Sequence, residues 1–479
     1  MEIFTKIIAT IGPASRDPET LRDLSKAGMN AARINLSHGD RRSQADLIGR
    51  LRELDPNLAI LLDTKGPEIR TAKMVADPTY FHSGQKVVLT HAALAGTVEK
   101  IPISYAHLDE IPLETRILFD DGLVEAKVIA KQGAEPVVQI LNSGPIGSRK
   151  KVTVQGYRVK LPFLTDEDKA DITFAVENDI RLIAASFVRC VQDVRQLKAF
   201  LEEKGARMRV FSKIEHPDAV EHLPEILQES DGIMVARGDL GVELPLQEVP
   251  GIQEKIIRAC NNAGKPVIVA TQMLESMRTN PRPTRAEVSD IAHAILQGSD
   301  AIMLSAETAT GKYPVRSVQM MKKIALEYEK QVRGIITKYR RNGETEKNEI
   351  AQYIAKAAFY ASKDLNVRAI LTPTKTGFTA QNVSRFKPKC PIYASTRDTT
   401  ALQHLQLVWG VEPLLDRETA DDESHDCTYY NLVRKCYDAG LLDRDDRIII
   451  TSGSKLINKR GTNLLEIYNV SDIINYNPS

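Results

Sequence analysis

One lysine and two carboxylates near the middle of the chain have the types and spacing of a charged reaction centre. Lys213 and Glu215 end one short apolar stretch, and Asp239 follows the next stretch, residues 233–237. Side chains alternate between the two faces of a strand, so Lys213 and Glu215 point the same way. A cation and carboxylates aimed together favour a site for a metal ion and an anion, with an ordinary surface ion pair as the alternative.

Length and composition describe a globular protein of several domains. The 479 residues are too many for one ordinary core and suggest roughly three domains. Hydrophobic residues make up 42% and charged residues 27% of the chain, and 64 basic against 63 acidic residues leave a net charge of +1. So close a balance gives no support to nucleic-acid or membrane binding as the main role.

The N-terminal residues and the cysteines favour a cytoplasmic protein. The first residues enter a strand pattern at once, which leaves no room for a signal peptide. No apolar run approaches the roughly 18 residues that a membrane helix requires. The five cysteines are odd in number and far apart, which suits free thiols in a reducing compartment. We therefore expect a soluble cytoplasmic protein.

Eight apolar stretches, each followed by a helix-like segment, dominate the first two thirds of the chain. This alternation is typical of parallel strands closed into a (β/α)8 TIM barrel. The expected strands span residues 6–12, 31–37, 59–64, 181–186, 210–213, 233–237, 266–271 and 300–305. Active sites of such barrels lie at the C-terminal ends of the strands. That rule nominates Arg33, Asn35, Ser37, Asp63, Lys213, Glu215, Asp239, Thr271, Ser305 and Glu307.

The alternation of strands and helices stops between the third and fourth strands. Residues 71–160 are rich in turns and in alternating Val and Ile but contain no convincing helix, which predicts a small inserted β-barrel domain. Because the insertion leaves the barrel from the face of the candidate site, we expect it to act as a lid that excludes water. An insertion without such a role is the alternative.

A third domain follows the barrel, which is expected to comprise residues 1–70 and 161–338. The charged, turn-forming segment 339–348 separates the two. Residues 349–479 show a new α/β series, which predicts an open-sheet α/β domain. Helices are expected at 349–364, 399–409 and 427–439, and strands at 368–372, 391–394, 411–415, 447–451 and 464–468.

Several long blocks resemble the pyruvate kinase family, in order and over essentially the full chain. They are ARINLSHG at 32–39, LDTKGPEIR at 62–70, SKIE at 212–215, MVARGDLG at 234–241, ATQMLESM at 270–277, PTRAE at 283–287 and MLSAET at 303–308. One short block would be weak evidence for a family. Many blocks in the same order are strong evidence, because they fall at positions that the barrel pattern had already indicated. The resemblance implies transfer of the phosphoryl group of phosphoenolpyruvate to ADP, followed by protonation of the enolate.

The resemblance assigns the metal ligands and the central cation. Glu215 and Asp239 would hold Mg²⁺ or Mn²⁺; Mg²⁺ favours oxygen ligands and usually keeps waters, so two carboxylates plus substrate oxygens suffice. Lys213 would stabilise negative charge on the transferring phosphoryl group and on the enolate oxygen. Phosphoryl transfer needs this kind of positioning and neutralisation more than covalent help from the protein.

The resemblance also assigns the substrate contacts. Arg33 resembles the phosphate-binding arginine, whose forked donors match phosphate geometry. The amides of Gly238 and Asp239, with the Thr271 hydroxyl, would hold the substrate carboxylate. Thr271 and Ser305 are candidates for the water-linked route that protonates the enolate, although hydroxyls at such positions often only cap the next helix.

Monovalent-cation and nucleotide contacts follow in the same way. The resemblance implies a K⁺ site built from Asn35, Ser37, Asp63 and Thr64, and ADP or ATP contacts from His38, Arg70 and Lys150. The hinge of the insertion departs from the family pattern Lys-Gly-Val-Asn-Leu-Pro-Gly. It reads KKVTVQG at 150–156, so Lys151 replaces a glycine and Gln155 a proline. His216, where the family tends to carry a smaller polar or a basic residue, is a milder departure.

The third domain contains a candidate site for a phosphorylated allosteric effector. A loop with hydroxyls and amides enters a helix there, which makes a phosphate cradle. By resemblance its residues are Thr374, Lys375, Thr376, Gly377 and Thr379, with Lys459 and Arg460 from the late loop 452–463 pairing a second phosphate. A plain helix cap beside an exposed basic loop is the alternative. The family is usually tetrameric, so we expect a homotetramer.

Two other functions stay open from the sequence. A (β/α)8 aldolase or lyase acting on a pyruvate enolate also needs Glu and Asp at strand ends. It would not need the nucleotide contacts, the K⁺ residues or a lid. A catalytically weakened relative that binds metabolites as a regulator is favoured only by the departures in residues 150–155, and the intact reaction centre opposes it.

The residue at position 68 predicts a requirement for K⁺. Family members that need K⁺ generally carry Glu there, and those that do not need it carry Lys; this chain has Glu68. We predict faster pyruvate formation in K⁺ buffer than in Na⁺ buffer of the same ionic strength. Equal steady-state rates in the two buffers would contradict the prediction.

Overall fold

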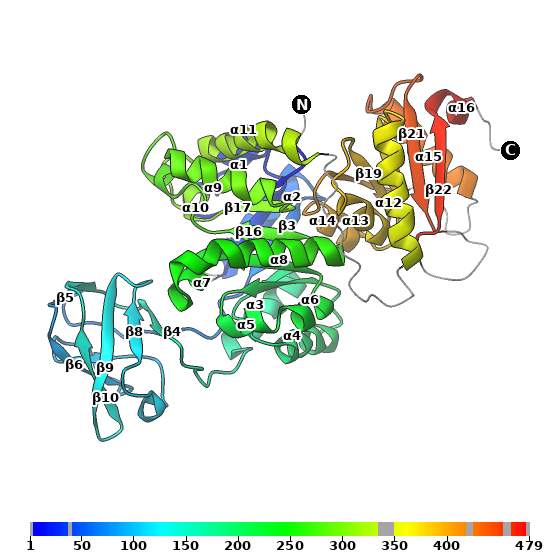
Figure 1. The fold of residues 1–479 in the computed structure, drawn as a ribbon. Helices are drawn as coiled ribbons and strands as arrows, with labels where there is room; N and C mark the ends of the chain where they lie inside the picture. The colour runs from blue at the N-terminus through cyan, green and yellow to red at the C-terminus, as the bar shows by residue number, and fades with distance from the viewer. Residues whose placement is uncertain (1–2, 37–40, 334–348, 418–424, 454–460, 476–479) are drawn as a thin grey trace.

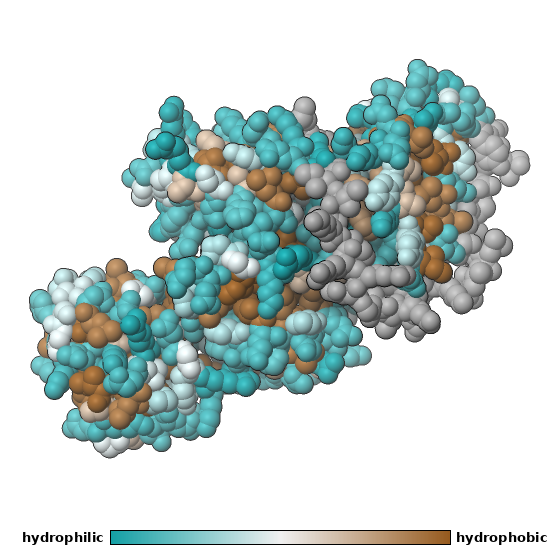
Figure 2. Space-filling model, in the orientation of Figure 1, coloured by the Kyte–Doolittle hydropathy of each residue, from teal (hydrophilic) through white to brown (hydrophobic). Residues whose placement is uncertain are grey.

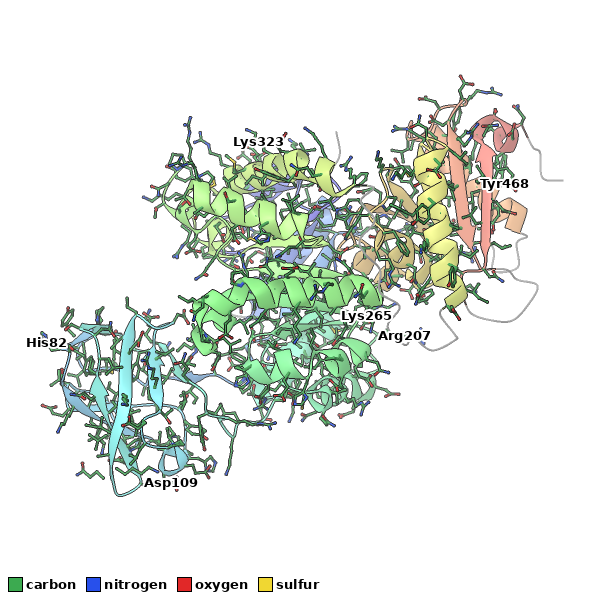
Figure 3. All side chains as sticks on the ribbon, viewed as in Figure 1. His82, Asp109, Arg207, Lys265, Lys323 and Tyr468 are labelled. Atoms are coloured by element: carbon green, nitrogen blue, oxygen red, sulfur yellow. The ribbon has the colours of Figure 1, made fainter. Side chains whose placement is uncertain are left out.

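The computed structural model describes residues 3–36, 41–333, 349–417, 425–453 and 461–475. Its three parts lie in a row, with a β-rich insertion at one end, a barrel in the middle and an α/β part at the other end (Figure 1). Figure 3 places His82 and Asp109 on the insertion and Tyr468 at the opposite end of the molecule. The fold class expected from the sequence is thereby confirmed.

Eight parallel strands close the central barrel. They are β1 (Lys6–Thr10), β2 (Ala31–Asn35), β3 (Ala59–Asp63), β13 (Leu182–Ala185), β14 (Arg209–Ile214), β15 (Gly232–Ala236), β16 (Val267–Ala270) and β17 (Ala301–Leu304). Their order around the barrel is β1-β17-β16-β15-β14-β13-β3-β2. On β14 the side chain of Phe211 packs inside the barrel and that of Ile214 packs outward under the helices. Because side chains alternate, Lys213 shares the inward face with Phe211.

Helices surround the barrel and hold its strands in place. They are α1 (Pro18–Ala27), α2 (Arg41–Leu54), α3 (Asp166–Glu177), α4 (Val191–Glu203), α5 (Pro217–Glu221), α6 (Leu223–Glu229), α7 (Arg237–Glu243), α8 (Val249–Ala263), α9 (Arg285–Leu296), α10 (Ala306–Ala309) and α11 (Pro314–Val332). Side-chain caps start several of them: Asp17 accepts from the Thr20 amide, and Thr165 and Asp168 form a reciprocal capping box. The final barrel helix, α11, ends at Val332.

The insertion folds as a small β structure that closes on itself. Its strands are β4 (Ile69–Arg70), β5 (Thr79–Phe81), β6 (Lys86–Thr90), β7 (Lys100–Pro102), β8 (Arg116–Phe119), β9 (Val124–Gln132), β10 (Glu135–Ile140), β11 (Gly144–Ile146) and β12 (Lys151–Val154). The main sheet has the order β4-β12-β8-β9-β10-β6-β7, and an antiparallel bridge between Thr71 and Ile103 joins its two edges. The chain enters at β4 and leaves at β12, so these paired strands form the hinge to the barrel.

The C-terminal part is an open five-stranded sheet in the order β20-β19-β18-β21-β22, with only β22 antiparallel. Its strands are β18 (Ala369–Pro373), β19 (Ile392–Thr396), β20 (Val411–Leu415), β21 (Arg447–Ser452) and β22 (Leu464–Asn469). Its helices are α12 (Glu349–Asp364), α13 (Phe378–Ser384), α14 (Thr399–Leu405), α15 (His425–Asp438) and α16 (Val470–Ile474). The helix expected at 399–409 is therefore shorter, because the chain turns after Leu405 to bury Leu407 and Trp409 against the barrel.

The C-terminal part docks at the end of the barrel opposite the candidate site. Lys387 Nζ lies 2.8 Å from Asp300 Oδ1, immediately before β17, and this ion pair is buried. Trp409 packs edge-on against Phe4, just before β1. The insertion, in contrast, leaves the barrel after β3, from the C-terminal ends of the strands. The two added parts thus occupy opposite ends of the barrel.

Candidate active site

The C-terminal ends of four neighbouring barrel strands bring the candidate residues together. Lys213 comes from β14, Asp63 ends β3, Arg33 comes from β2 and Ser186 follows β13. Around the barrel the order β14-β13-β3-β2 makes these strands consecutive. Parallel strands end at the same rim of the barrel. Side chains far apart in the sequence therefore meet there, and Arg33 and Lys213 are 180 positions apart.

Lys213 occupies the centre of the site. Its Nζ lies 3.0 Å from Asp63 Oδ1, 2.9 Å from Glu215 Oε1 and 2.7 Å from Ser186 Oγ. The side chains of Lys213, Asp63 and Glu215 are 10%, 2% and 1% exposed. Exposed ion pairs contribute about 0–1 kcal/mol, whereas removing one partner of a buried pair costs about 3–5 kcal/mol. This burial rules out the surface ion pair that the sequence left open.

Glu215 and Asp239 are, besides Asp63, the carboxylates whose charges act on this lysine. Glu215 Oε2 accepts a hydrogen bond of 2.7 Å from the Phe187 amide. Burial raises the pKa of Glu215 to about 7, and the nearby Asp239 charge adds to the shift against the opposing effect of Lys213. Burial acts in the same direction on Asp239, but Lys151 and Lys213 outweigh it and lower the pKa of that carboxyl. The neighbouring lysines therefore stabilise the negative charge of Asp239 more than that of Glu215.

Arg33 and Asp63 extend the charged network on the other side of Lys213. Arg33 Nε donates to Asp63 Oδ2 at 2.7 Å, and its Nη1 donates to Thr10 Oγ1 at 3.0 Å. Burial alone would raise the pKa of Asp63, but Arg33 and Lys213 hold it below its usual range. Arg33 is therefore fixed at the rim by an ionised carboxylate, with its side chain 13% exposed.

The loop after β16 is held in a strained conformation beside Asp239. Thr271 has φ 69°, in the left-handed region that favours glycine. Arg237 donates to the Thr271 carbonyl at 2.7 Å and to both oxygens of Asp290 at 2.7 Å, which anchors the loop. Thr271 Oγ1 accepts from the Gly238 amide at 2.7 Å, so this amide and hydroxyl, both predicted substrate contacts, already touch each other.

Ser305 stands at the end of β17 and is positioned by a buried glutamate. The Glu307 carboxylate accepts from the Ser305 amide at 2.7 Å and from the Leu274 amide at 3.0 Å. Glu307 is fully buried, and burial raises its pKa. Glu307 therefore ties the Ser305 turn to the Thr271 loop, which is a positioning role for a residue the barrel rule nominated.

The predicted K⁺ and nucleotide residues are only partly described. Ser37 and His38 lie outside the described residues. Thr64 is buried, and its Oγ1 accepts from the Ser186 amide at 3.0 Å. Arg70 is held by Glu68, with 2.8 Å from Nε to Oε2, so Glu68 lies in the hinge rather than in open solvent.

The two hinge lysines point in different directions. Lys150 Nζ lies 2.9 Å from Asp120 Oδ2, so the predicted nucleotide contact pairs within the insertion. The next residue, Lys151, instead reaches the barrel and binds Asp239 Oδ1. Gln155 also bridges the parts, because its Nε2 donates to the Val242 carbonyl at 3.1 Å. The departures from the family pattern are therefore contacts between insertion and barrel.

His216 serves as a helix cap rather than as part of the reaction centre. Its Nδ1 accepts from the Asp218 amide at 3.1 Å at the start of α5. Burial lowers the pKa of His216, and the nearby Arg189 and Arg158 act in the same direction. A neutral imidazole is the form that accepts this hydrogen bond.

Glu215 and Asp239 fit a hard divalent cation. Both side chains offer only oxygen ligands, and burial raises the pKa of Glu215. Among the described residues, no three or more His, Cys, Asp or Glu side chains converge as a metal site. The donor set thus suits an ion such as Mg²⁺, which takes one or two carboxylates and keeps other positions for water and substrate.

Several residues of the site were not predicted from the sequence. Ser186 bonds Lys213 and also donates to the Thr64 carbonyl at 2.6 Å. Phe187, with φ 55°, presents its amide to Glu215. Arg237 anchors the Thr271 loop. The barrel rule could have nominated Ser186, since it is the polar residue that ends the fourth expected strand.

The candidate effector loop lies between β18 and α13. Thr374 Oγ1 accepts from the Gly377 amide at 3.1 Å, and Gly377 has φ 86°. Thr379 Oγ1 and Thr462 Oγ1 lie 2.7 Å apart, which joins the helix start to the late loop. Arg209, at the start of β14, donates to the Thr376 carbonyl at 3.1 Å. Lys459 and Arg460 lie outside the described residues.

Comparison with known proteins identifies the family. The model of the pyruvate kinase barrel domain matches residues 3–318, and that of the pyruvate kinase alpha/beta domain matches residues 352–468. The chain belongs to the pyruvate kinase family. It is similar to the pyruvate kinase of Geobacillus stearothermophilus, with 43% identity over 99% of this chain and 81% of the relative. The pyruvate kinase of Sporosarcina psychrophila is 42% identical over 98% of this chain and 81% of its own length.

A solved structure supports the same assignment. The crystal structure of a pyruvate kinase from Cryptosporidium parvum superposes with a TM-score of 0.88 at 34% identity, covering 98% of this chain and 96% of the other. Pyruvate kinases are phosphotransferases, so this chain is an enzyme of that class. None of the helices in the described part of the chain is long and apolar enough to cross a membrane.

Arg237 should control the order of the Thr271 loop. In Arg237→Met the Thr271 carbonyl loses its donor and Asp290 loses its partner, so the strained loop opens more often. We predict that amides of residues 271–274 exchange hydrogen roughly tenfold faster or more. Hydrogen-exchange mass spectrometry measures this. Arg195→Met, which removes an exposed pair with Glu229, is the matched control, and unchanged exchange at 271–274 in Arg237→Met would contradict the prediction.

Proposed function

We propose that this enzyme transfers the phosphoryl group of phosphoenolpyruvate to ADP, giving pyruvate and ATP. One observation carries the proposal: Lys213 lies buried between Asp63 and Glu215 at the rim of the barrel. A fixed ammonium at this place suits a reaction in which negative charge moves from a phosphoryl group to an enolate. Membership of the pyruvate kinase family supplies the reaction class.

The residues divide the work by their charge and position. Arg33 offers its forked donors to the substrate phosphate, and Asp63 keeps that fork oriented. Lys213 stabilises charge on the transferring group and then on the enolate oxygen, without reorganisation because its partners hold it in place. Mg²⁺ or Mn²⁺, when bound by Glu215 and Asp239, would neutralise phosphoryl oxygens. The protein thus acts by positioning and by electrostatic stabilisation.

We assign binding of the substrate carboxylate and delivery of the enolate proton to the Thr271 loop and its neighbours. The amides of Gly238 and Asp239 and the Thr271 hydroxyl would hold the carboxylate, with the present Gly238–Thr271 hydrogen bond exchanged for the ligand. Thr271 and Ser305 would organise the water that delivers the proton. Arg237 and Glu307 fix these two turns, which keeps the hydroxyls in one place.

We also propose that the enzyme acts in glycolysis in the cytoplasm and that it binds K⁺ and a nucleotide. We assign K⁺ to Asn35, Ser37, Asp63 and Thr64, and the nucleotide to His38, Arg70 and Lys150. The insertion would close over the site as a lid, since β4 and β12 form its hinge at the rim of the barrel.

Regulation by a phosphorylated metabolite is assigned to the C-terminal part. The loop before α13 and the first turn of that helix suit a phosphate, and the assigned residues are Thr374, Lys375, Thr376, Gly377 and Thr379. Lys459 and Arg460 would pair a second phosphate. The Arg209–Thr376 hydrogen bond supports coupling between the effector loop and the active site, because Arg209 and Lys213 lie on the same strand, β14.

A homotetramer is the assembly we propose. The C-terminal part exposes apolar side chains on α12 and on the edge strand β22, including Ile350 at 62% and Ile467 at 39% exposed. Figure 2 shows apolar residues gathered on this part of the surface. Exposed apolar patches of this kind mark association surfaces. Sedimentation velocity would show the mass of four chains; a monomer at micromolar concentration would contradict the assembly.

One assay separates the proposed reaction from its alternatives. Phosphoenolpyruvate, ADP, Mg²⁺ and K⁺ are mixed with the enzyme, and pyruvate and ATP are followed together. The proposal predicts equal amounts of both products and none without ADP. Pyruvate formed without ADP would favour a lyase, and the absence of pyruvate would favour a metabolite-binding regulator.

Lys213→Met tests the central role of the ammonium. The variant keeps the length of the side chain but loses the charge, so we predict near-normal binding of phosphoenolpyruvate and a fall in kcat of roughly 10³-fold. Fluorescence titration gives binding and steady-state kinetics give kcat. Lys198→Met, which removes an ammonium from the outer helix α4, is the control. A kcat close to wild type in Lys213→Met would remove the residue from this role.

Thr376→Glu tests the effector loop. A carboxylate there would repel a bound phosphate, so a sugar bisphosphate that lowers the half-saturating phosphoenolpyruvate concentration of the wild type should have no effect on the variant. Steady-state titrations with the sugar bisphosphate as probe measure the shift. An equal response in both proteins would exclude this loop as the effector site.

A further inference from the structure

Lys151 connects the insertion to the reaction centre through a side chain that crosses the hinge. It is the first residue of β12, and its ammonium binds Asp239 Oδ1 in the first turn of α7. The Lys151 side chain is 14% exposed, whereas that of its neighbour Lys150 is 44% exposed. A lysine this well covered is held by its surroundings and not by a chance surface contact.

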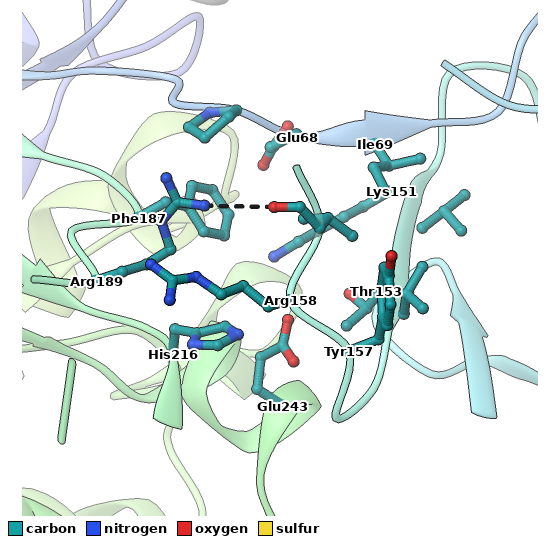
Figure 4. A pocket seen from close by; sticks show the side chains of 14 residues that line it. Glu68, Ile69, Lys151, Thr153, Tyr157, Arg158, Phe187, Arg189, His216 and Glu243 are labelled. Atoms are coloured by element: carbon teal, nitrogen blue, oxygen red, sulfur yellow. Dashed lines mark hydrogen bonds between the residues drawn. The ribbon is translucent and has the colours of Figure 1, made fainter. Parts of the chain in front are cut away.

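The surroundings of Lys151 stabilise a positive charge at this position. Its Nζ lies 5.2 Å from the centre of the Phe187 ring, within the range of a cation–π interaction. The carboxylates of Glu215 and Glu68 add electrostatic attraction. Figure 4 shows Lys151 together with Phe187, Glu68 and Glu243. These four residues line a cavity of about 50 Å³. The insertion therefore places an ammonium group on Asp239, a carboxylate assigned to the divalent metal.

A metal ion and this ammonium cannot both use Asp239 at low cost. A divalent cation bound to Asp239 and Glu215 would place like charges in contact in a partly buried site, where repulsion is strong. The Lys151 ammonium already occupies Asp239 Oδ1, an oxygen that the metal would use. The cavity beside it is lined by Glu243 and Glu68, which offer carboxylate oxygens to a displaced Lys151.

We propose that Lys151 is a positioning residue that competes with the divalent metal for Asp239. In the metal-free enzyme it neutralises Asp239 and ties the insertion to the barrel; metal binding releases it toward the cavity. Lys151 thereby sets the metal affinity. This inference rests on the proposed metal role of Glu215 and Asp239.

The test measures metal binding without turnover. Mn²⁺ is titrated into the full-length protein and free Mn²⁺ is followed by electron paramagnetic resonance. Lys151→Met should bind Mn²⁺ about tenfold more tightly than the wild type, because a charge-assisted contact no longer has to break. Lys151→Gln, which keeps a polar side chain in the cavity, should show the same direction and serves if the methionine variant fails to fold.

Two further variants separate competition from a general structural effect. Lys151→Arg keeps the charge and should bind Mn²⁺ as weakly as the wild type. Lys100→Met removes an ammonium that pairs with Glu135 inside the insertion and should leave the affinity unchanged. Equal or weaker Mn²⁺ binding by Lys151→Met and Lys151→Gln would overturn the proposal. Absence of Mn²⁺ binding in the wild type and in all variants would overturn the metal assignment itself.

Discussion

The buried ammonium of Lys213 is the interaction on which the rest of the site depends. Asp63, Glu215 and Ser186 surround it, and they come from three different strands of the barrel. Burial opposes the charge, but Asp63 and Glu215 outweigh it and hold the lysine pKa above its usual range. A charge so expensive to bury persists only with its partners complete. The closed barrel supplies them, because it fixes the strand ends relative to one another.

Contacts at the two ends of the barrel connect the C-terminal part and the insertion to this centre. Arg209 begins β14 and contacts the loop before α13, while Lys213 and Glu215 stand at its other end. On the rim, Lys151 brings the insertion onto Asp239, which faces the same lysine. Strand β14 thus lies between the candidate regulatory loop and the candidate reaction centre, and the Lys151–Asp239 ion pair links that centre to the insertion.

Sequence reasoning predicted the strands and helices, and the shared orientation of Lys213 and Glu215, because both follow from local periodicity. The eight apolar stretches and the spacing of Lys213 and Glu215 needed no tertiary information. Ser186 ends an expected strand and was overlooked, whereas the role of Phe187 depends on which strands become neighbours and on a left-handed backbone at that residue. Lys151 was noticed only as a departure from a pattern, since its contact with Asp239 spans 88 positions and depends on the fold of the hinge.

Anomalous diffraction from crystals soaked in Mn²⁺ tests the account most directly, because it locates the ion without reference to activity. We predict one strong peak within coordinating distance of the Glu215 and Asp239 carboxylates, with the Lys151 ammonium no longer on Asp239. A peak elsewhere, or a fully occupied ion beside an unmoved Lys151, would contradict it.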